Sequence, residues 1–169
     1  MLTLSAAKLL IDYKSWADEL TLASVAKLPP GEAHRQRPTL FKSIIGTLNH
    51  SLIVDLIWRA HLEGREHGFS SRREILHDDV AALASAQRSC NEWLQGWCSS
   101  QTDASLGQLA RFKFISGEAG QMTRGAIVFH IVNHATYHRG WVSDLFFQVP
   151  AKPPTTDTCA YPGVLARGD

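Results

Sequence analysis

The sequence predicts an all-α protein: a four-helix bundle with a short extended or hairpin segment before the last helix. Three observations lead to this prediction. Four long stretches repeat apolar residues at helical spacing, the connections between them are short or irregular, and the chain has no internal repeat. The 169 residues fit one domain, with an ordinary globular content of 44% hydrophobic residues. We assign residues 1–150 to the helical domain and the proline-rich residues 151–169 to a C-terminal strap of the same domain.

The first two helices are predicted over residues 4–27 and 40–63. Apolar residues recur at three- and four-residue steps in the first helix, which ends at LPPGE because proline cannot continue a helix. Thr39 is the expected N-cap of the second helix. That helix is apolar on most of its circumference, Phe41 included, so we expect it to be central and buried.

The last two helices are predicted over residues 73–98 and 122–148, the second of them ended by Pro150. Between them, residues 99–121 alternate apolar and polar side chains and break at Gly117. This pattern predicts two short strands or extended arms.

Histidines on two of these helices form a candidate metal site. His130, His134 and His138 follow one another at steps of four and share one face of the last helix. Two imidazoles at this spacing can reach one metal ion, although the spacing alone is weak evidence. His50 lies within the apolar second helix, where a buried imidazole needs partners for both nitrogens.

Facing helices of a bundle commonly build metal sites from inward side chains, so His50 could meet His134 and His138 there. The alternative is a core histidine bonded to a backbone carbonyl or to Tyr137. Three histidine ligands would leave coordination positions open, which is typical of a reactive metal. A thermolysin-like protease is excluded, because Ala135 stands where the HExxH motif has its glutamate.

The order of four segments resembles the DinB/YfiT-like family of metal-binding four-helix bundles. YKSWADELTLASVAKLPPGE is similar to the family's opening helix, SIIGTLNHSLIVDLIWRAHLEG to its second helix, HIVNHATYHRG to its signature and PPTTDTCAY to its closing strap. The resemblance covers nearly the whole chain and implies an up-down-down-up bundle and a homodimer. It also implies that His50, His134 and His138 hold one divalent ion, most often zinc or nickel.

Further residues are candidates for the surroundings of the site. Arg139 could pair with a carboxylate across the bundle or hold an anionic substrate, and we favour the structural role. After HRG the family usually has glutamine, and this chain has a tryptophan, so we expect a narrower and more apolar pocket. The candidates for outer-shell or pocket positions are His130, Tyr137, Arg139, Trp141 and Trp58.

Two expectations concern residues outside this site. Gly140 inside a helix indicates the close approach of another helix, because glycine there costs about 1 kcal/mol relative to alanine. The histidines among charged or loop residues are expected to be solvated: His34, His61, His67 and His77.

Two functions of different classes fit the pattern. The first is a metal-dependent enzyme acting on a small molecule, either a hydrolase or a transferase that uses a low-molecular-weight thiol. Three neutral ligands leave the divalent charge uncompensated, so a bound water would be acidified or a thiol held as thiolate. No evident carboxylate base is present, which favours the thiolate. The alternative is a non-catalytic metal-binding or stress-response module.

Charge and composition argue against other classes. The net charge of +1 offers no basic field for a nucleic-acid backbone, and no apolar stretch is long enough to span a membrane. The first residues lack the pattern of a secretory signal. The three cysteines lack metal-site or disulfide spacing and are expected to be reduced: Cys90, Cys98 and Cys159. We therefore expect a cytoplasmic protein without nucleic-acid or membrane partners.

Overall fold

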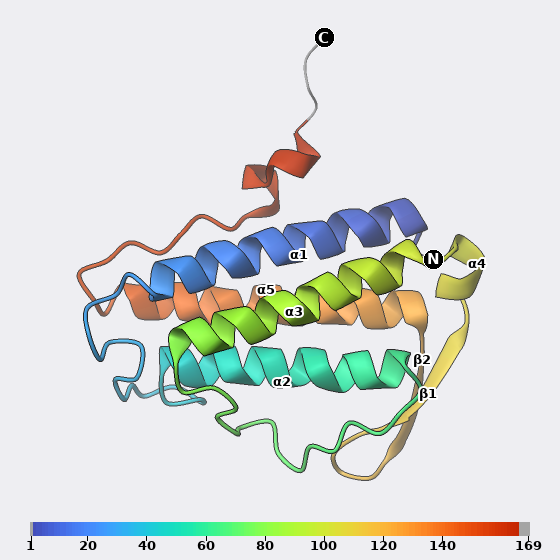
Figure 1. The fold of residues 1–169 in the computed structure, drawn as a ribbon, viewed down its shortest axis with the longest axis horizontal. Coiled ribbons are helices and arrows are strands. Elements are labelled where there is room, and N and C mark those ends of the chain that lie inside the picture. Colours follow the sequence, from blue (N-terminus) through green and yellow to red (C-terminus); the bar gives the residue numbers. More distant parts are fainter. Residues whose placement is uncertain (1, 166–169) are drawn as a thin grey trace.

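The computed structural model describes residues 2–165 and is mostly helical, as the sequence predicts (Figure 1). Within these residues it contains five α-helices and one two-stranded sheet. The elements are α1 (Leu4–Val25), α2 (Ile44–Leu62), α3 (Val80–Ser99), α4 (Asp103–Leu106), β1 (Leu109–Lys113), β2 (Ala119–Thr123) and α5 (Arg124–Phe146). In the described part of the chain, no helix is long and apolar enough to cross a membrane.

The four long helices lie side by side, and their buried apolar residues form three clusters among the described residues. α1 contacts α3 and α5, and α2 contacts the same two helices. Nearly every residue of α2 is buried, as its apolar sequence predicts. Part of this burial comes from the connection after α2, whose residues 71–77 lie on the helix. Asn49 Oδ1 accepts hydrogen bonds from the backbone nitrogens of Leu76 and His77, at 2.8 and 2.9 Å.

The second helix begins four residues later than the sequence predicts, and Thr39 is not its cap. Ser43 is the N-cap, and its Oγ accepts a hydrogen bond from the Gly46 nitrogen at 3.0 Å. Lys42 has a φ of 67°, in the left-handed region, so the backbone cannot be helical there. Phe41 therefore lies in the connection and its ring is free to pack on α2 from outside.

The third helix begins at Val80 and not at residue 73. Residues 71–77 cannot be helical because their backbone groups bond to α2 instead. Asp79 then caps α3, since its side chain accepts from the Ala82 nitrogen at 2.8 Å.

The segment before α5 contains the two predicted strands, but it begins with a short helix that the sequence pattern does not reveal. Thr102 and Ser105 form a capping box that starts α4. The strands pair antiparallel, from Leu109 opposite Thr123 to Lys113 opposite Ala119. Gly117, with a φ of 87°, supplies the left-handed residue of the turn.

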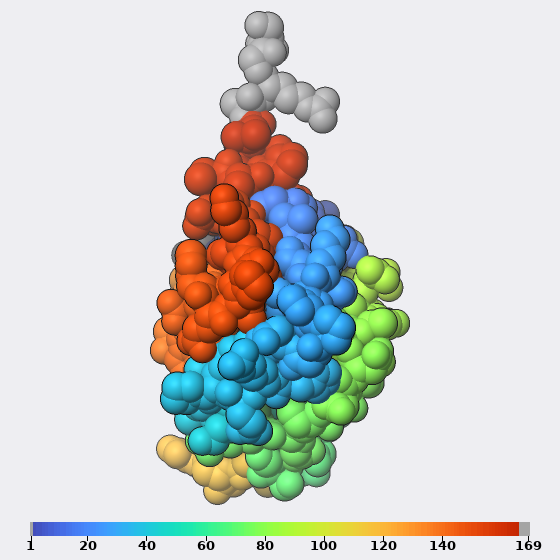
Figure 2. Space-filling model, turned by 90° about the vertical axis from the view of Figure 1, so that its left-hand side faces the viewer, coloured from blue at the N-terminus to red at the C-terminus, as the bar shows by residue number. Residues whose placement is uncertain are grey.

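The chain after α5 returns along α1 (Figure 1). Figure 2 shows one end of the molecule, where the connection between α1 and α2 lies against the segment that follows α5. Ala33 and Val149 join the same apolar cluster there. Further along, Tyr161 packs on Tyr13 and Trp16, with ring centroids 6.1 and 5.4 Å apart. Residues 166–169 of the predicted strap lie outside the described residues.

Candidate metal centre

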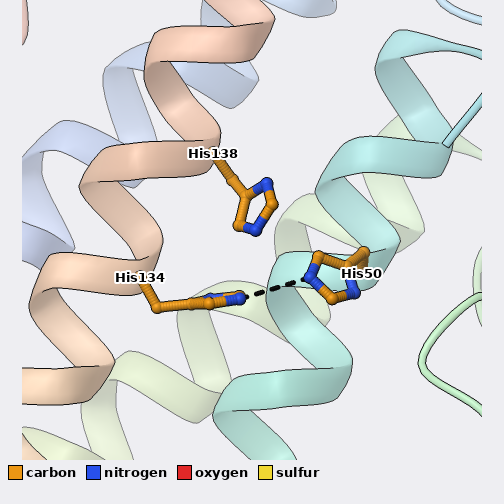
Figure 3. A group of neighbouring side chains, drawn as sticks. All are labelled: His50, His134 and His138. Carbon is orange, nitrogen blue, oxygen red and sulfur yellow. Dashed lines mark hydrogen bonds between the residues drawn. The ribbon is translucent and has the colours of Figure 1, made fainter. Parts of the chain in front are cut away.

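Three histidines from two neighbouring helices point toward one another (Figure 3). His134 and His138 lie one turn apart on α5, and His50 faces them from α2. One ring nitrogen from each residue lies within 4.8 Å of the other two. The structure thus brings together the three residues that the sequence pattern selects.

The backbone of the connection after α2 orients His50. Its Nδ1 lies 2.8 Å from the carbonyl oxygen of Arg72. A carbonyl oxygen only accepts, so Nδ1 carries the proton and the lone pair of Nε2 faces the other two rings. The Phe41 ring stacks on His50, with centroids 4.0 Å apart and an interplanar angle of 16°. Sequence reasoning missed both contacts, because it placed Phe41 inside the second helix and assigned no structure to the connection that contains Arg72.

The spacing of the nitrogens fits a metal ion. His50 Nε2 and His134 Nε2 are 3.2 Å apart. Two nitrogens that each lie about 2.0–2.1 Å from one tetrahedral ion are separated by about 3.3–3.4 Å. The same separation also suits a hydrogen bond between the rings, with one Nε2 protonated.

All three rings favour the neutral form, which is the form that binds metal. Burial is the largest cause and neighbouring histidines the second; together they lower the pKa of His138 to about 4 and that of His134 to about 2. Burial also lowers the pKa of His50, with a smaller contribution from the charges of Arg72 and Arg73. At neutral pH each ring therefore offers a lone pair without first losing a proton.

These pKa values predict how the stability of the metal-free protein depends on pH. As pH falls below about 6.5, histidines of the unfolded chain take up protons while His138 and His134 in the folded chain stay neutral. The free energy of unfolding is expected to decrease as pH falls from about 6.5 toward 4, and to vary little above that window. Urea unfolding of the metal-free protein across this range measures it. The His134→Phe variant should show a flatter profile, and a flat profile in the wild type would contradict the assignment.

Aromatic residues form one wall of the centre. Trp141 lies against His138, with centroids 4.9 Å apart, and Phe41 lies 6.0 Å from Trp141. Tyr137 also packs beside His138 at 5.2 Å, but it is 58% exposed. The partner of the His50 Nδ1 is the Arg72 carbonyl and not Tyr137. The candidate site therefore has an apolar side at the Trp141 position.

His130 and Trp58 lie next to the centre without joining it. The His130 ring is 5.7 Å from His134, and Trp58 packs on the far side of His130 at 4.9 Å. The prediction that His61 is solvated is wrong, because its side chain is only 6% exposed. It is covered by Phe112 of the hairpin, whose ring stacks on it at 4.9 Å.

Buried charges lie beside the three histidines. Lys14 and Asp55 are fully buried, and Lys14 Nζ lies 2.8 Å from Asp18 Oδ2 and 2.6 Å from Asp55 Oδ2. Arg139 donates from Nη1 to Asp18 Oδ1 at 2.9 Å, so its partner is a carboxylate across the bundle. We call Lys14, Asp18, Asp55 and Arg139 the buried ion network.

Gly140 does not mark a close approach between helices of this chain. Apart from its two chain neighbours and the backbone of its own helix, a Cβ placed there would meet no atom of the described residues within 4 Å. The residue lies on the exposed face of α5, where its neighbours along the surface are solvent-facing side chains. The expectation of tight helix packing at this position is therefore wrong.

Comparisons with known proteins agree with this architecture. The model of the DinB family matches residues 1–164. A solved structure of a DinB-like protein from Bacillus cereus is similar, with a TM-score of 0.68 and 16% sequence identity. The alignment covers 91% of this chain and 97% of that one, and at this identity it shows the fold alone. Comparison with the curated proteins finds no match.

Proposed function

The chain belongs to the DinB family, and from this premise we propose that it binds one divalent ion, zinc or nickel, through His50, His134 and His138. The observation that carries the proposal is the convergence of three neutral imidazoles, with one nitrogen of each within 4.8 Å of the others. The 3.2 Å separation of two of these nitrogens supports tetrahedral ligation. Three protein ligands leave a coordination position open.

The open position serves catalysis on a small molecule, by hydrolysis or by transfer to a low-molecular-weight thiol. A bound divalent ion would supply the positive charge that acidifies a water or holds a thiol as thiolate. Arg72 and Arg73 add positive charge near His50, which favours an anionic group at this site. Phe41 and Trp141 offer an apolar wall to the remainder of the substrate. Within the described residues, no carboxylate joins the three-histidine group as a base, which favours the thiolate.

Metal content and turnover test this function. Protein purified without an affinity tag is expected to contain about one zinc or nickel ion per chain by elemental analysis. The loaded protein is then tested with bacillithiol, mycothiol or glutathione plus an electrophile, and separately with esters. Metal-dependent thiol transfer supports the transferase, and metal-dependent ester hydrolysis supports the hydrolase. A chain that stays free of metal even after reconstitution with either ion would contradict the proposal.

The second candidate is a non-catalytic metal-binding or stress-response module. The same lack of a carboxylate in the three-histidine group, among the described residues, favours it. This function predicts stoichiometric metal without turnover of either class of substrate. Turnover that disappears on metal removal and returns on reloading would exclude it.

The helices are proposed to follow the up-down-down-up order that the family resemblance implies. The contacts of α1 and α2 with both α3 and α5 support this order. So does the connection of residues 63–79, which is long enough to return along the bundle and start α3 at the same end as α2 (Figure 1).

A further inference from the structure

Asp18 is linked to the candidate metal centre through α5. His138 and Arg139 are consecutive residues of that helix. A contact that fixes the Arg139 side chain to another helix therefore limits how α5 can turn about its axis, and with it the position of His138. The Arg139 guanidinium is buried and makes three hydrogen bonds from two of its nitrogens: Nη1 donates to Asp18 Oδ1 at 2.9 Å, and Nη2 donates to Thr136 Oγ1 at 2.9 Å and to the Tyr13 hydroxyl at 3.2 Å. Two of these acceptors belong to α1, so α1 holds α5 at this point.

Asp18 and the candidate ligand His138 also line the same small cavity. The cavity has a volume of about 10 Å³, which is room for about one water molecule. Its walls come from all four long helices, and polar side chains form part of them. They include His138 and Arg139 from α5, Asp18 and Thr21 from α1, Ser51 from α2 and Gln87 from α3. The inner side of a candidate ligand therefore faces polar groups of the same network.

We propose that Asp18 is a positioning residue for the candidate metal centre, because it holds Arg139 and thereby sets the direction of the His138 ring. The inference rests on the metal function proposed above. Of the two carboxylates in the buried ion network, Asp18 is the one that contacts α5. Asp55 instead contacts Lys14 at 2.6 Å and Gln87 at 2.8 Å, which belong to α1 and α3.

This difference supplies a matched control. Asp18→Asn and Asp55→Asn each neutralise one buried carboxylate that contacts Lys14, and only the first removes the ion pair with Arg139. Asp18→Asn is expected to weaken Zn²⁺ binding by about 10- to 100-fold, the usual range for residues that orient a ligand. Asp55→Asn is expected to change it by less than about threefold, since the partners of the Asp55 carboxylate are Lys14 of α1 and Gln87 of α3 and it makes no hydrogen bond to α5 among the described residues.

Zn²⁺ affinity is measured by competition with a chromophoric chelator, at a temperature where circular dichroism shows both variants folded. Equal losses in the two variants would mean that the network acts through stability alone and would overturn the proposal. An affinity of Asp18→Asn close to that of the wild type would overturn it as well. If Asp18→Asn does not fold, Arg139→Lys replaces it, because lysine keeps the charge but loses the planar guanidinium, whose Nη1 donates to Asp18 while Nη2 donates to Tyr13 and Thr136. Wild-type affinity in folded Arg139→Lys then overturns the proposal.

A second measurement needs no metal and separates this proposal from the metal function. In the metal-free protein, the ring nitrogen resonances of His138 are expected to shift in Asp18→Asn and to stay in place in Asp55→Asn. Unchanged His138 resonances in Asp18→Asn would overturn the positioning role. A wild type that binds no Zn²⁺ but shows the selective shift would reject the metal function and leave the positioning of His138 supported.

Discussion

Replacement of His134 by alanine is expected to weaken zinc or nickel binding by about 100- to 1,000-fold. Structural zinc sites bind with about 10–16 kcal/mol over four ligands, so one ligand contributes about 2.5–4 kcal/mol. Burial and both partner rings lower the pKa of His134 to about 2, so its lone pair is available to a metal at neutral pH. Its Nε2 is also the atom that lies 3.2 Å from His50. Chelator competition and elemental analysis measure the loss.

His130→Ala is the matched control for this variant. It removes a histidine from the same face of α5, one turn away, whose ring lies 5.7 Å from His134. Because His130 is absent from the three-histidine group, the affinity should change by less than about threefold. Full metal occupancy in His134→Ala, or an equal loss in both variants, would show that the metal is held elsewhere.

Replacement of Lys14 by methionine is expected to lower the free energy of unfolding by about 3–5 kcal/mol at neutral pH, the usual loss when one partner of a buried ion pair is removed. Burial alone would lower the pKa of Lys14, but the attraction of Asp18 and Asp55 outweighs it and raises the pKa above its ordinary value. Without the lysine, the carboxylates of Asp18 and Asp55 remain inside the bundle. Arg139, which pairs with Asp18, is then the one cation left in the buried ion network. Urea unfolding of the metal-free protein measures the loss.

Acidification provides an internal check on this explanation. Burial raises the pKa of Asp55 even with Lys14 present. When Lys14 is gone, the carboxylates can relieve their repulsion by taking up protons, so the gap between variant and wild type should narrow as pH decreases. Lys8→Met, which changes an exposed lysine of the same helix, should alter stability by no more than about 0.5 kcal/mol. A similar effect of both substitutions would contradict the role of the network.

The sequence pattern predicts the four long helices because each carries enough apolar residues at helical spacing to be recognised locally. The starts of α2 and α3 could not be predicted in the same way. At Lys42 the backbone is left-handed. In the connection after α2, the Leu76 nitrogen donates to Asn49 and the Arg72 carbonyl oxygen accepts from His50, so these backbone groups bond to α2. Both effects depend on packing between distant segments, which spacing alone does not encode.

The candidate metal centre could be predicted because its signals also lie within single helices. His134 and His138 are one helical turn apart, and His50 stands out in an apolar helix. The buried ion network had a similar signal, an aspartate inside the apolar run SLIVDLIW, but the sequence does not say which cation reaches Asp55. Lys14 looks like an ordinary polar position of α1. His61 is buried because Phe112 of the hairpin packs on it. The sequence around His61 gives no sign of this contact between distant segments.

The buried ion network also constrains the order in which the chain can fold. Asp18 and Arg139 are 121 residues apart in sequence, so the second cation of the network arrives only when α5 has been synthesised. Before that moment, α1, α2 and α3 could enclose only Lys14 with two carboxylates, and burying an uncompensated charge opposes collapse. We therefore expect a nascent chain that lacks α5 to stay more open than the full chain. The core closes when the helix that carries two of the three candidate ligands has arrived.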